Sequence, residues 1–366
     1  MRKNPFRLTA LLVVIGLPLL AVLVYQLPPV KDRLEWRFDL AQAYWRGVFN
    51  PAGDVPTPLP QITETLAPTQ TSSPTPTITT TPKTPQPTQT FTPSPTPMPA
   101  SISLNPPAWE KQGPNNCGPA TLSMYLRYYG WEGDQELIAD LIKPNAKDRN
   151  VNVEEIVYYV RTRAGWLNAQ FRVGGDIRLL KSLLAAGFPV MIEESFYDEQ
   201  AFWPGDDLWA AHYLLLTGYD DPSQTFTGQD SYRGADQKIP YDTLNEYWKA
   251  FNRVYILVYR PEQEETLKAL LGVHWDVDTN RRHALEVAQK EVQADPQDAF
   301  AWFNVGSNLV YFERYAEAGR AYDEARKIGL PQRMLRYQFG PFFAYFHASR
   351  NADLLALTEY VLKNTP

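Results

Sequence analysis

Cysteine and histidine are scarce in this sequence, with one cysteine, Cys117, and 4 histidines among 366 residues. A single cysteine excludes an intrachain disulfide framework. The sequence contains neither an H-E-x-x-H zinc motif nor a G-x-x-x-x-G-K-[ST] phosphate-binding loop, so no metal ion and no cofactor is predicted. The net charge of −6 comes without a clustered basic patch, and nucleic acid is therefore not an expected partner.

One long apolar run lies near the start of the chain, at residues 8–27, and it contains no charged residue. About twenty such residues are enough to cross a bilayer. Basic residues precede the run, as in a signal anchor. We predict an uncleaved transmembrane anchor within residues 1–29 and a juxtamembrane segment over residues 30–54. That second segment fits either an amphipathic helix on the membrane surface or a simple spacer.

Proline, threonine and serine dominate residues 55–106, which hold too few apolar side chains to bury a core. Segments of this composition typically form disordered stalks that hold a domain away from a cell surface. We therefore expect a single-pass protein of the cell membrane, with everything after residue 55 outside the cytoplasm. A disordered cytoplasmic linker is the alternative interpretation.

Residues 107–260 have the composition of a globular domain. Helix-forming patterns come first and strand-forming patterns dominate later, which predicts an α+β domain with an antiparallel sheet. The expected helices cover residues 118–129, 134–142, 153–164 and 176–186. The expected strands cover residues 168–173, 188–194, 212–219, 225–230 and 253–259.

The last part of the chain, residues 261–366, repeats with a period of 34 residues. Glycines recur at Gly272, Gly306 and Gly340, and alanines recur at Ala284, Ala318 and Ala352. This period, with glycine early and alanine later, is typical of all-α tetratricopeptide-like repeats. Such helix pairs bury their apolar faces by stacking on one another, and they offer a surface for a protein partner. An ordinary helical bundle is the rival prediction.

Cys117 lies where a helix is expected to start. Gly113 to Asn116 favour a turn, and Pro119 suits the first turn of a helix, where its missing N–H is not needed. A helix N-terminus stabilises an anion and lowers the pKa of a thiol. Cys117 is therefore a candidate thiolate nucleophile. The alternative is a small buried apolar residue, which is a frequent role of free cysteine.

His212 is the one histidine within residues 107–260, and it opens a strand with a buried apolar run. Residues 220–224 predict a turn, after which the chain returns to Asp230. A hairpin centred there brings positions 212 and 230 opposite each other or onto a diagonal, close enough for Asp230 to accept a hydrogen bond from the His212 ring. Together with the thiol, these residues form a candidate Cys-His-Asp triad.

Two further features lie near these residues. Gln112 is five positions before the thiol, where its amide either donates to a developing oxyanion or is simply a surface group. Residues 195–211, rich in aromatic and acidic side chains, directly precede His212. This segment fits either a wall or lid of a substrate groove, or a loop whose aromatics pack on the domain.

These motifs are similar to those of a known family. The block from Gln112 through Cys117-Gly118-Pro119-Ala120 to Gly130, followed by His212 and Asp230, resembles the bacteriocin-processing, double-glycine leader peptidase superfamily. The resemblance covers residues 107–260. It implies a papain-like fold, a catalytic triad of Cys117, His212 and Asp230, and Gln112 as the oxyanion donor. Ser231 follows Asp230 where relatives often have proline.

These observations lead to the hypothesis of a membrane-anchored, extracytoplasmic cysteine peptidase that acts on a peptide or protein substrate. Two alternatives stay open at this point. One is a non-enzymatic scaffold that binds a peptide or protein. The other is a cell-envelope amidase or acyl transferase that uses the same triad, because all these enzymes share an acyl-enzyme.

Overall fold

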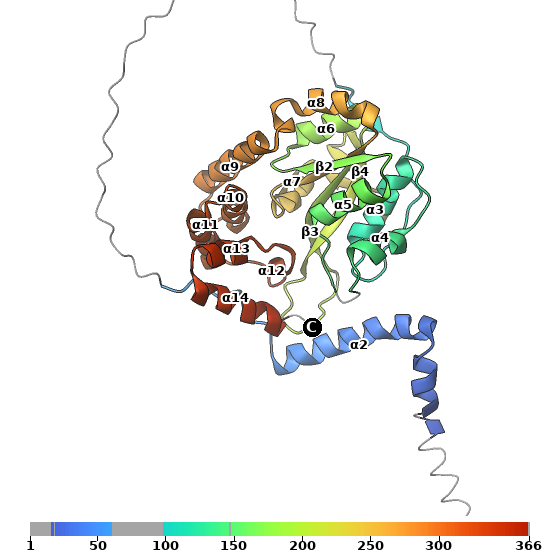
Figure 1. Ribbon diagram of the computed structural model, residues 1–366, viewed down its shortest axis with the longest axis vertical. Coiled ribbons are helices and arrows are strands. Elements are labelled where there is room, and N and C mark those ends of the chain that lie inside the picture. Colours follow the sequence, from blue (N-terminus) through green and yellow to red (C-terminus); the bar gives the residue numbers. More distant parts are fainter. Residues whose placement is uncertain (1–15, 18, 61–97, 146–147, 365–366) are drawn as a thin grey trace, which may run out of the picture.

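A seven-stranded sheet forms the centre of the folded part, with helices on both of its faces (Figure 1). The computed structural model describes residues 16–17, 19–60, 98–145 and 148–364. The strands follow the order β2-β7-β3-β4-β5-β6, β1 pairs with β4, and all pairs are antiparallel. Their bounds are β1 Ser101–Ser103, β2 Asn168–Arg172, β3 Val190–Tyr197, β4 Trp209–Asp220, β5 Thr225–Asp230, β6 Gly234–Pro240 and β7 Tyr255–Tyr259.

Two layers of helices cover the sheet because successive side chains of a strand point to opposite faces. Leu215 of β4 packs with the helices α3 to α5, and its neighbour Leu214 packs with α6 and α7. The helices are α3 Cys117–Tyr128, α4 Gln135–Ile142, α5 Val153–Arg163, α6 Ile177–Ala185 and α7 Tyr241–Lys249. The predicted α+β domain with an antiparallel sheet is therefore confirmed.

Every predicted helix and strand of this domain is present, but three further elements had not been predicted. Strand β1 lies just before the domain, and β6 and α7 fill residues 234–249. Strand β6 has a single large apolar side chain in its interior, Ile239, and lies at the edge of the sheet, so it lacks the alternation that marks a half-buried strand. Helix α7 buries Leu244 and Trp248, one helical turn apart.

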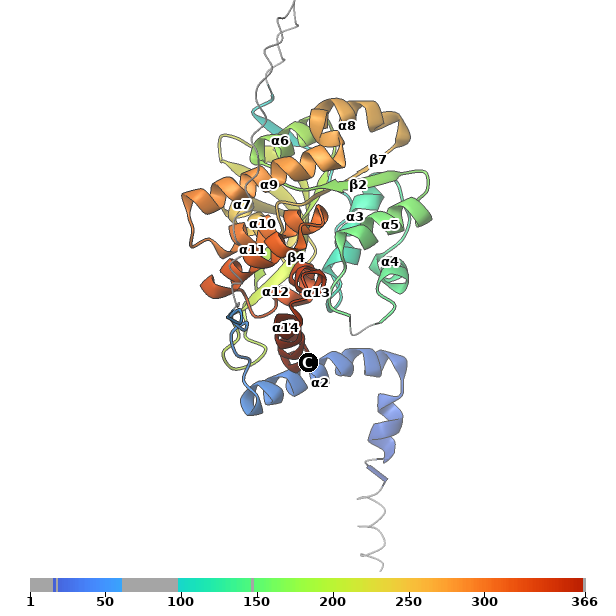
Figure 2. The same ribbon diagram turned by 60° about the vertical axis from the view of Figure 1, so that its left-hand side comes forward.

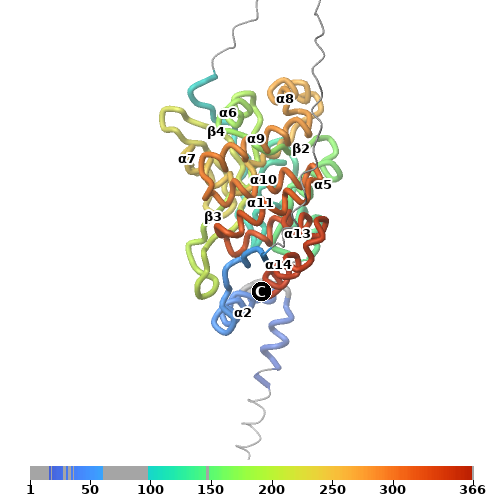
Figure 3. Tube along the Cα trace, turned by 90° about the vertical axis from the view of Figure 1, so that its left-hand side faces the viewer, coloured from blue at the N-terminus to red at the C-terminus, as the bar shows by residue number. Residues whose placement is uncertain are grey.

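The chain beyond residue 260 is helical and stacks along one side of the sheet (Figures 1 and 3). Tyr322 packs against Gly306, where an added Cβ would lie 2.6 Å from the tyrosine ring, so a glycine is needed for this helix pair to close. The tetratricopeptide assignment stays a prediction. The helices are α8 Glu264–Leu271, α9 Val277–Ala294, α10 Ala299–Tyr311, α11 Tyr315–Ile328, α12 Met334–Tyr337, α13 Gly340–His347 and α14 Asn351–Asn364, with short 3-10 turns at Pro261–Gln263 and Gly272–Trp275.

Buried amides tie this helical region to the sheet domain. Asn280 exchanges hydrogen bonds of 3.0 and 2.9 Å with the backbone of Val173. The side chains of Asn252 and Asn308 bond to each other at 3.0 and 3.2 Å. Apolar residues of both parts, such as Trp209 and Phe303, belong to one continuous core. The helical region is thus fixed to the domain rather than tethered to it.

The segment before the predicted stalk is docked as well. Helix α2 (Pro28–Phe49) lies beneath the body beside α14 (Figures 1 and 2). Its Gly47 meets Trp203 so closely that a Cβ there would lie 2.5 Å from the Cβ of Trp203. The predicted anchor falls mostly on residues 1–15 and 18, which are outside the described residues. Among the helices that are described, none has the length and apolar character needed to span a membrane.

Both ends of the predicted stalk make ordered contacts. Val55 is buried in the helical region, and Arg326 donates to the carbonyl oxygens of Pro56 and Thr57 at 2.8 and 3.1 Å. At the other end, Ile102 pairs with Tyr219 in the sheet. The ordered structure therefore extends into the segment assigned to the stalk, and residues 61–97 lie outside the described residues.

Candidate active site

Cys117 is the first residue of helix α3, as predicted. The helix itself is a core element, and its residues 118–126 are all buried, so the position of the thiol is fixed by packing. The Cys117 side chain is partly accessible. Burial alone raises the pKa of this thiol, but a hydrogen bond to His212, the charge of that ring and the backbone of Tyr213 and Gly118 outweigh it and lower the pKa. The position favours a thiolate.

His212 lies on β4 and links the thiol to a carboxylate. Its Nε2 is 2.9 Å from Oδ1 of Asp230, and both side chains are buried. Because Nε2 is engaged, the other ring nitrogen, Nδ1, is the one available to the Cys117 thiol. Burial alone lowers the pKa of His212, but its bonds to Asp230 and Cys117 and their charges raise it to about 10. The pair thus favours a thiolate and an imidazolium over the neutral forms.

Asp230 is the last residue of β5 and is held in place from two sides. Its Oδ1 also accepts hydrogen bonds from the backbone N–H groups of Tyr232 and Arg233, at 2.8 and 3.0 Å. Burial raises the pKa of Asp230, but His212 and these N–H groups lower it overall, so the carboxylate stays ionised. The β4–β5 register pairs Leu215 with Gln229, which puts residues 212 and 230 on the predicted diagonal of the hairpin.

Gln112 is tied to the residue that follows Asp230. Its backbone N–H donates to the carbonyl oxygen of Ser231 at 2.9 Å, and its side-chain oxygen accepts from the Ser231 hydroxyl at 2.9 Å. Ser231 is fully buried. Gln112 is therefore held in place rather than free at the surface, and its role as the oxyanion donor stays a prediction.

Two adjacent buried acids of β3 lie beside the site on opposite faces of the sheet, and the sequence analysis did not single them out. Glu194 pairs with His212 across the sheet, and its Oε2 has no hydrogen-bond partner among the described residues. Burial, and then the charge of Asp230, raises the pKa of Glu194 to about 7. Burial, and then the charge of Cys117, raises the pKa of Glu193 well above its usual value. The signal in the sequence that could have identified them is a pair of adjacent acidic residues inside an otherwise apolar strand.

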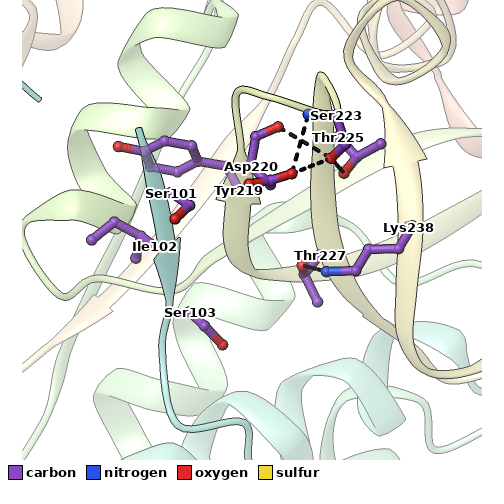
Figure 4. Close-up of a pocket in the computed structure, with 9 residues that line it drawn as sticks. All are labelled: Ser101, Ile102, Ser103, Tyr219, Asp220, Ser223, Thr225, Thr227 and Lys238. Atoms are coloured by element: carbon purple, nitrogen blue, oxygen red, sulfur yellow. Dashed lines mark hydrogen bonds between the residues drawn. The ribbon is translucent and has the colours of Figure 1, made fainter. Parts of the chain in front are cut away.

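A small pocket opens beside the thiol. It is lined by residues of the α3 start, the loop before α5, strands β3 and β4, and helix α12: Asn115, Cys117, Gly118, Arg149, Asn150, Val151, Glu193, Ala211, Tyr213 and Tyr337. A second, more open pocket lies at the far end of β4 (Figure 4). It is lined by Asp220, Thr227 and Lys238 among others, and Lys238 donates to Thr227 at 2.6 Å. Eight residues of strand separate Asp220 from His212, about 26 Å at 3.3 Å per residue, so this second pocket is not part of the site.

Metal ligands do not gather anywhere in the part of the chain that the structure describes, where no group of three or more His, Cys, Asp or Glu side chains is placed to hold an ion. A thiolate, an imidazolium that it contacts and an ionised carboxylate behind the ring are groups suited to nucleophilic attack on a carbonyl.

Comparison with known proteins supports the assignment of this domain. Residues 102–256 match the model of the Peptidase_C39 like family. No curated protein matches the chain. Similar solved structures include a putative C39-like peptidase from Bacillus anthracis, with 18% identity over 44% of this chain and 98% of that one, at a TM-score of 0.35.

Two further solved structures are similar. A double glycine motif protease from an AMS/PCAT transporter, solved with the leader peptide, shares 18% identity over 43% of this chain and 94% of that one, at a TM-score of 0.32. Xylellain, a cysteine protease from Xylella fastidiosa, shares 14% identity over 45% of this chain and 87% of that one, at a TM-score of 0.34. The family match confirms the predicted resemblance: residues 102–256 are similar to the C39-like peptidases.

Proposed function

We propose that this chain is an active cysteine peptidase that hydrolyses peptide bonds through Cys117, His212 and Asp230. One observation carries the proposal: the buried His212 ring bonds to Asp230 through Nε2 and to the Cys117 thiol, so nucleophile, base and carboxylate form one connected unit. The Cys117 thiolate attacks the carbonyl carbon, and the amide of Gln112 stabilises the oxyanion. His212 protonates the leaving amine and then takes a proton from the attacking water.

The experiment is cleavage of a peptide library by the full chain, compared with Cys117→Ala. We expect Cys117→Ala to abolish cleavage and labelling by iodoacetamide, since this thiol is the only one in the sequence. Wild-type protein should react with iodoacetamide faster than free cysteine at neutral pH, because the pKa of Cys117 is lowered. A reaction rate equal to that of free cysteine would contradict the proposal.

Hydrolysis and acyl transfer share the same acyl-enzyme, so the amidase or acyl-transferase alternative is decided by the acceptor. Adding an excess of a simple amine to the cleavage assay distinguishes them. A hydrolase gives the free acid as its main product, and a transferase gives the amide. The scaffold alternative predicts neither product, and the contact between Cys117 and His212 speaks against it.

The proposed location is the outer side of a cell membrane, with residues 8–27 as a single anchor. The apolar run in the sequence supports it. Helix α2, which follows the run, turns Phe38, Trp45 and Phe49 outward, each more than half exposed. These aromatics lie on the helix face opposite Gly47, which packs on Trp203. Such a face suits the headgroup region of a bilayer. Protease protection of the full chain in sealed vesicles tests the orientation.

A further inference from the structure

One wall of the pocket beside the thiol comes from outside the peptidase domain. Tyr337 belongs to α12 in the helical region, yet it lines the pocket together with Cys117. The other pocket residues come from residues 115–213, within the domain that matches the family model. The helical region therefore reaches the candidate active site directly.

Tyr337 is held firmly in this position. Its ring makes an edge contact with Trp209, with the ring centroids 5.9 Å apart. Asn150 donates to its carbonyl oxygen at 3.4 Å, and its hydroxyl hydrogen-bonds to the backbone of Ala211, the residue before His212. The tyrosine thus contacts both sides of the pocket, the loop before α5 and the start of β4.

Helix α12 is in turn locked to the loop that joins β3 and β4. Arg333 donates to the carbonyl oxygen of Trp209 at 2.7 Å and to Asp206 at 2.5 Å, and its side chain and that of Asp206 are buried. Its guanidinium also lies over the ring of Trp203, 4.2 Å from the centroid. The backbone N–H of Gln332 donates to Asp207 at 2.7 Å. The aromatic and acidic segment before His212 is therefore the docking site of α12.

We propose that Tyr337 is a specificity-determining residue and that the helical region, through it, limits the size of the substrate side chain that enters the pocket beside Cys117. This inference rests on the proposed peptidase activity. Tyr337 donates no proton to the reaction and contacts no reacting atom in the mechanism above. It lines the pocket together with Glu193 and Tyr213, so a bulky side chain and the tyrosine compete for the same volume.

The experiment compares the full chain with Tyr337→Ala, Tyr337→Leu and Tyr337→Phe on peptides that differ in the residue bound in this pocket. We expect the ratio of kcat/KM for bulky over small side chains to rise about 10-fold or more in the alanine variant, and less in the leucine variant. Tyr337→Phe keeps the ring and should keep the wild-type profile. Phe343→Ala, which truncates an exposed aromatic of α13, is the matched control and should also keep it.

A uniform loss of kcat/KM on all peptides in the alanine and leucine variants, with the ratio unchanged, would overturn the inference. Labelling of Cys117 distinguishes failure of this inference from failure of the proposed peptidase activity, because labelling needs no peptide cleavage. We compare the rates of iodoacetamide and a bulky aryl chloroacetamide. Tyr337→Ala and Tyr337→Leu should accelerate the bulky reagent selectively, even if no peptide is cleaved. Equal acceleration of both reagents, or of neither, contradicts the size limit.

Discussion

Glu194 beside the active site and Asp353 in the helical region are both buried acids, with 6% and 2% of their surface exposed. Burial raises the pKa of each, yet the net shifts have opposite directions. The pKa of Asp353 is lowered because Arg350, Arg326 and the N–H of Leu59 surround its carboxylate. The pKa of Glu194 is raised to about 7 because no such partners outweigh its burial and the charge of Asp230.

The buried charges of the helical region stabilise the fold, whereas the ionisable groups around Cys117 serve the chemistry of the site. In the helical region, Arg326 pairs with Asp353 at 3.0 Å and Arg350 pairs with Asp323 at 2.6 Å, so each buried charge is neutralised locally. Around Cys117, the pKa values of the thiol, of His212 and of the acids Glu193 and Glu194 are all shifted. Groups with shifted pKa values in a pocket are typical of active sites. The comparison predicts that substitutions of buried charges in the helical region lower stability, whereas substitutions around Cys117 change catalysis or its pH dependence.

The largest effect is expected for Arg326→Met, and it should fall on stability. Arg326 is fully buried, and its loss removes a partner of Asp353 and two hydrogen bonds to the segment at residues 56–57. We expect the free energy of unfolding to fall by about 3–5 kcal/mol. Denaturant unfolding measures it, and the alkylation rate of Cys117 in the folded protein should not change.

The control for that variant is Arg314→Met, which removes an exposed ion pair with Glu317. Exposed pairs contribute at most about 1 kcal/mol. Equal losses of stability in the two variants would break the distinction between buried and exposed charge in the helical region.

Gln112→Ala should act on catalysis instead. Loss of one oxyanion donor typically lowers kcat by about 10²–10³-fold. The free energy of unfolding should change by only about 1 kcal/mol, because one hydrogen bond, from Ser231, is lost. Steady-state kinetics and unfolding of the same preparation test both parts. Lys111→Ala, at the exposed neighbouring position, is the control, and a kcat matching this control would show that Gln112 is not the donor.

Asp230→Asn should change the pH dependence of peptide cleavage. The reactive form needs the Cys117 thiolate and the His212 imidazolium, and the imidazolium is lost as pH rises through the His212 pKa of about 10. Asp230 raises that pKa, so its neutralisation should move the alkaline limb down by about 1–3 pH units. The pH profile of kcat/KM for peptide cleavage measures the shift, because His212 must be protonated to protonate the leaving amine. Asp220→Asn, at the far end of β4 in the same hairpin, should leave the limb in place.

The sequence predicted the parts of the site that depend on local order. Cys117 at a helix start and Asp230 returning on a hairpin follow from turn residues and strand periodicity, which act over short stretches of chain. Tyr337 was not predicted because its place beside Cys117 depends on how two separate parts of the chain pack. Val55 was assigned to the stalk because its neighbours are prolines and threonines, and only its burial in the helical region distinguishes it.

The hydrogen bonds between Arg326 and residues 56–57 have a consequence for the integrity of the molecule. Helix α14 joins the same contact, since Asp353 accepts from the N–H of Leu59 at 3.1 Å. The segments on either side of residues 61–97 both contact the folded body, one through Arg326 and the other through β1. A backbone cut between them would therefore yield two fragments that stay associated, with α2 still beneath the C-terminal helices. A nicked molecule would therefore keep its parts in position although its backbone is no longer continuous.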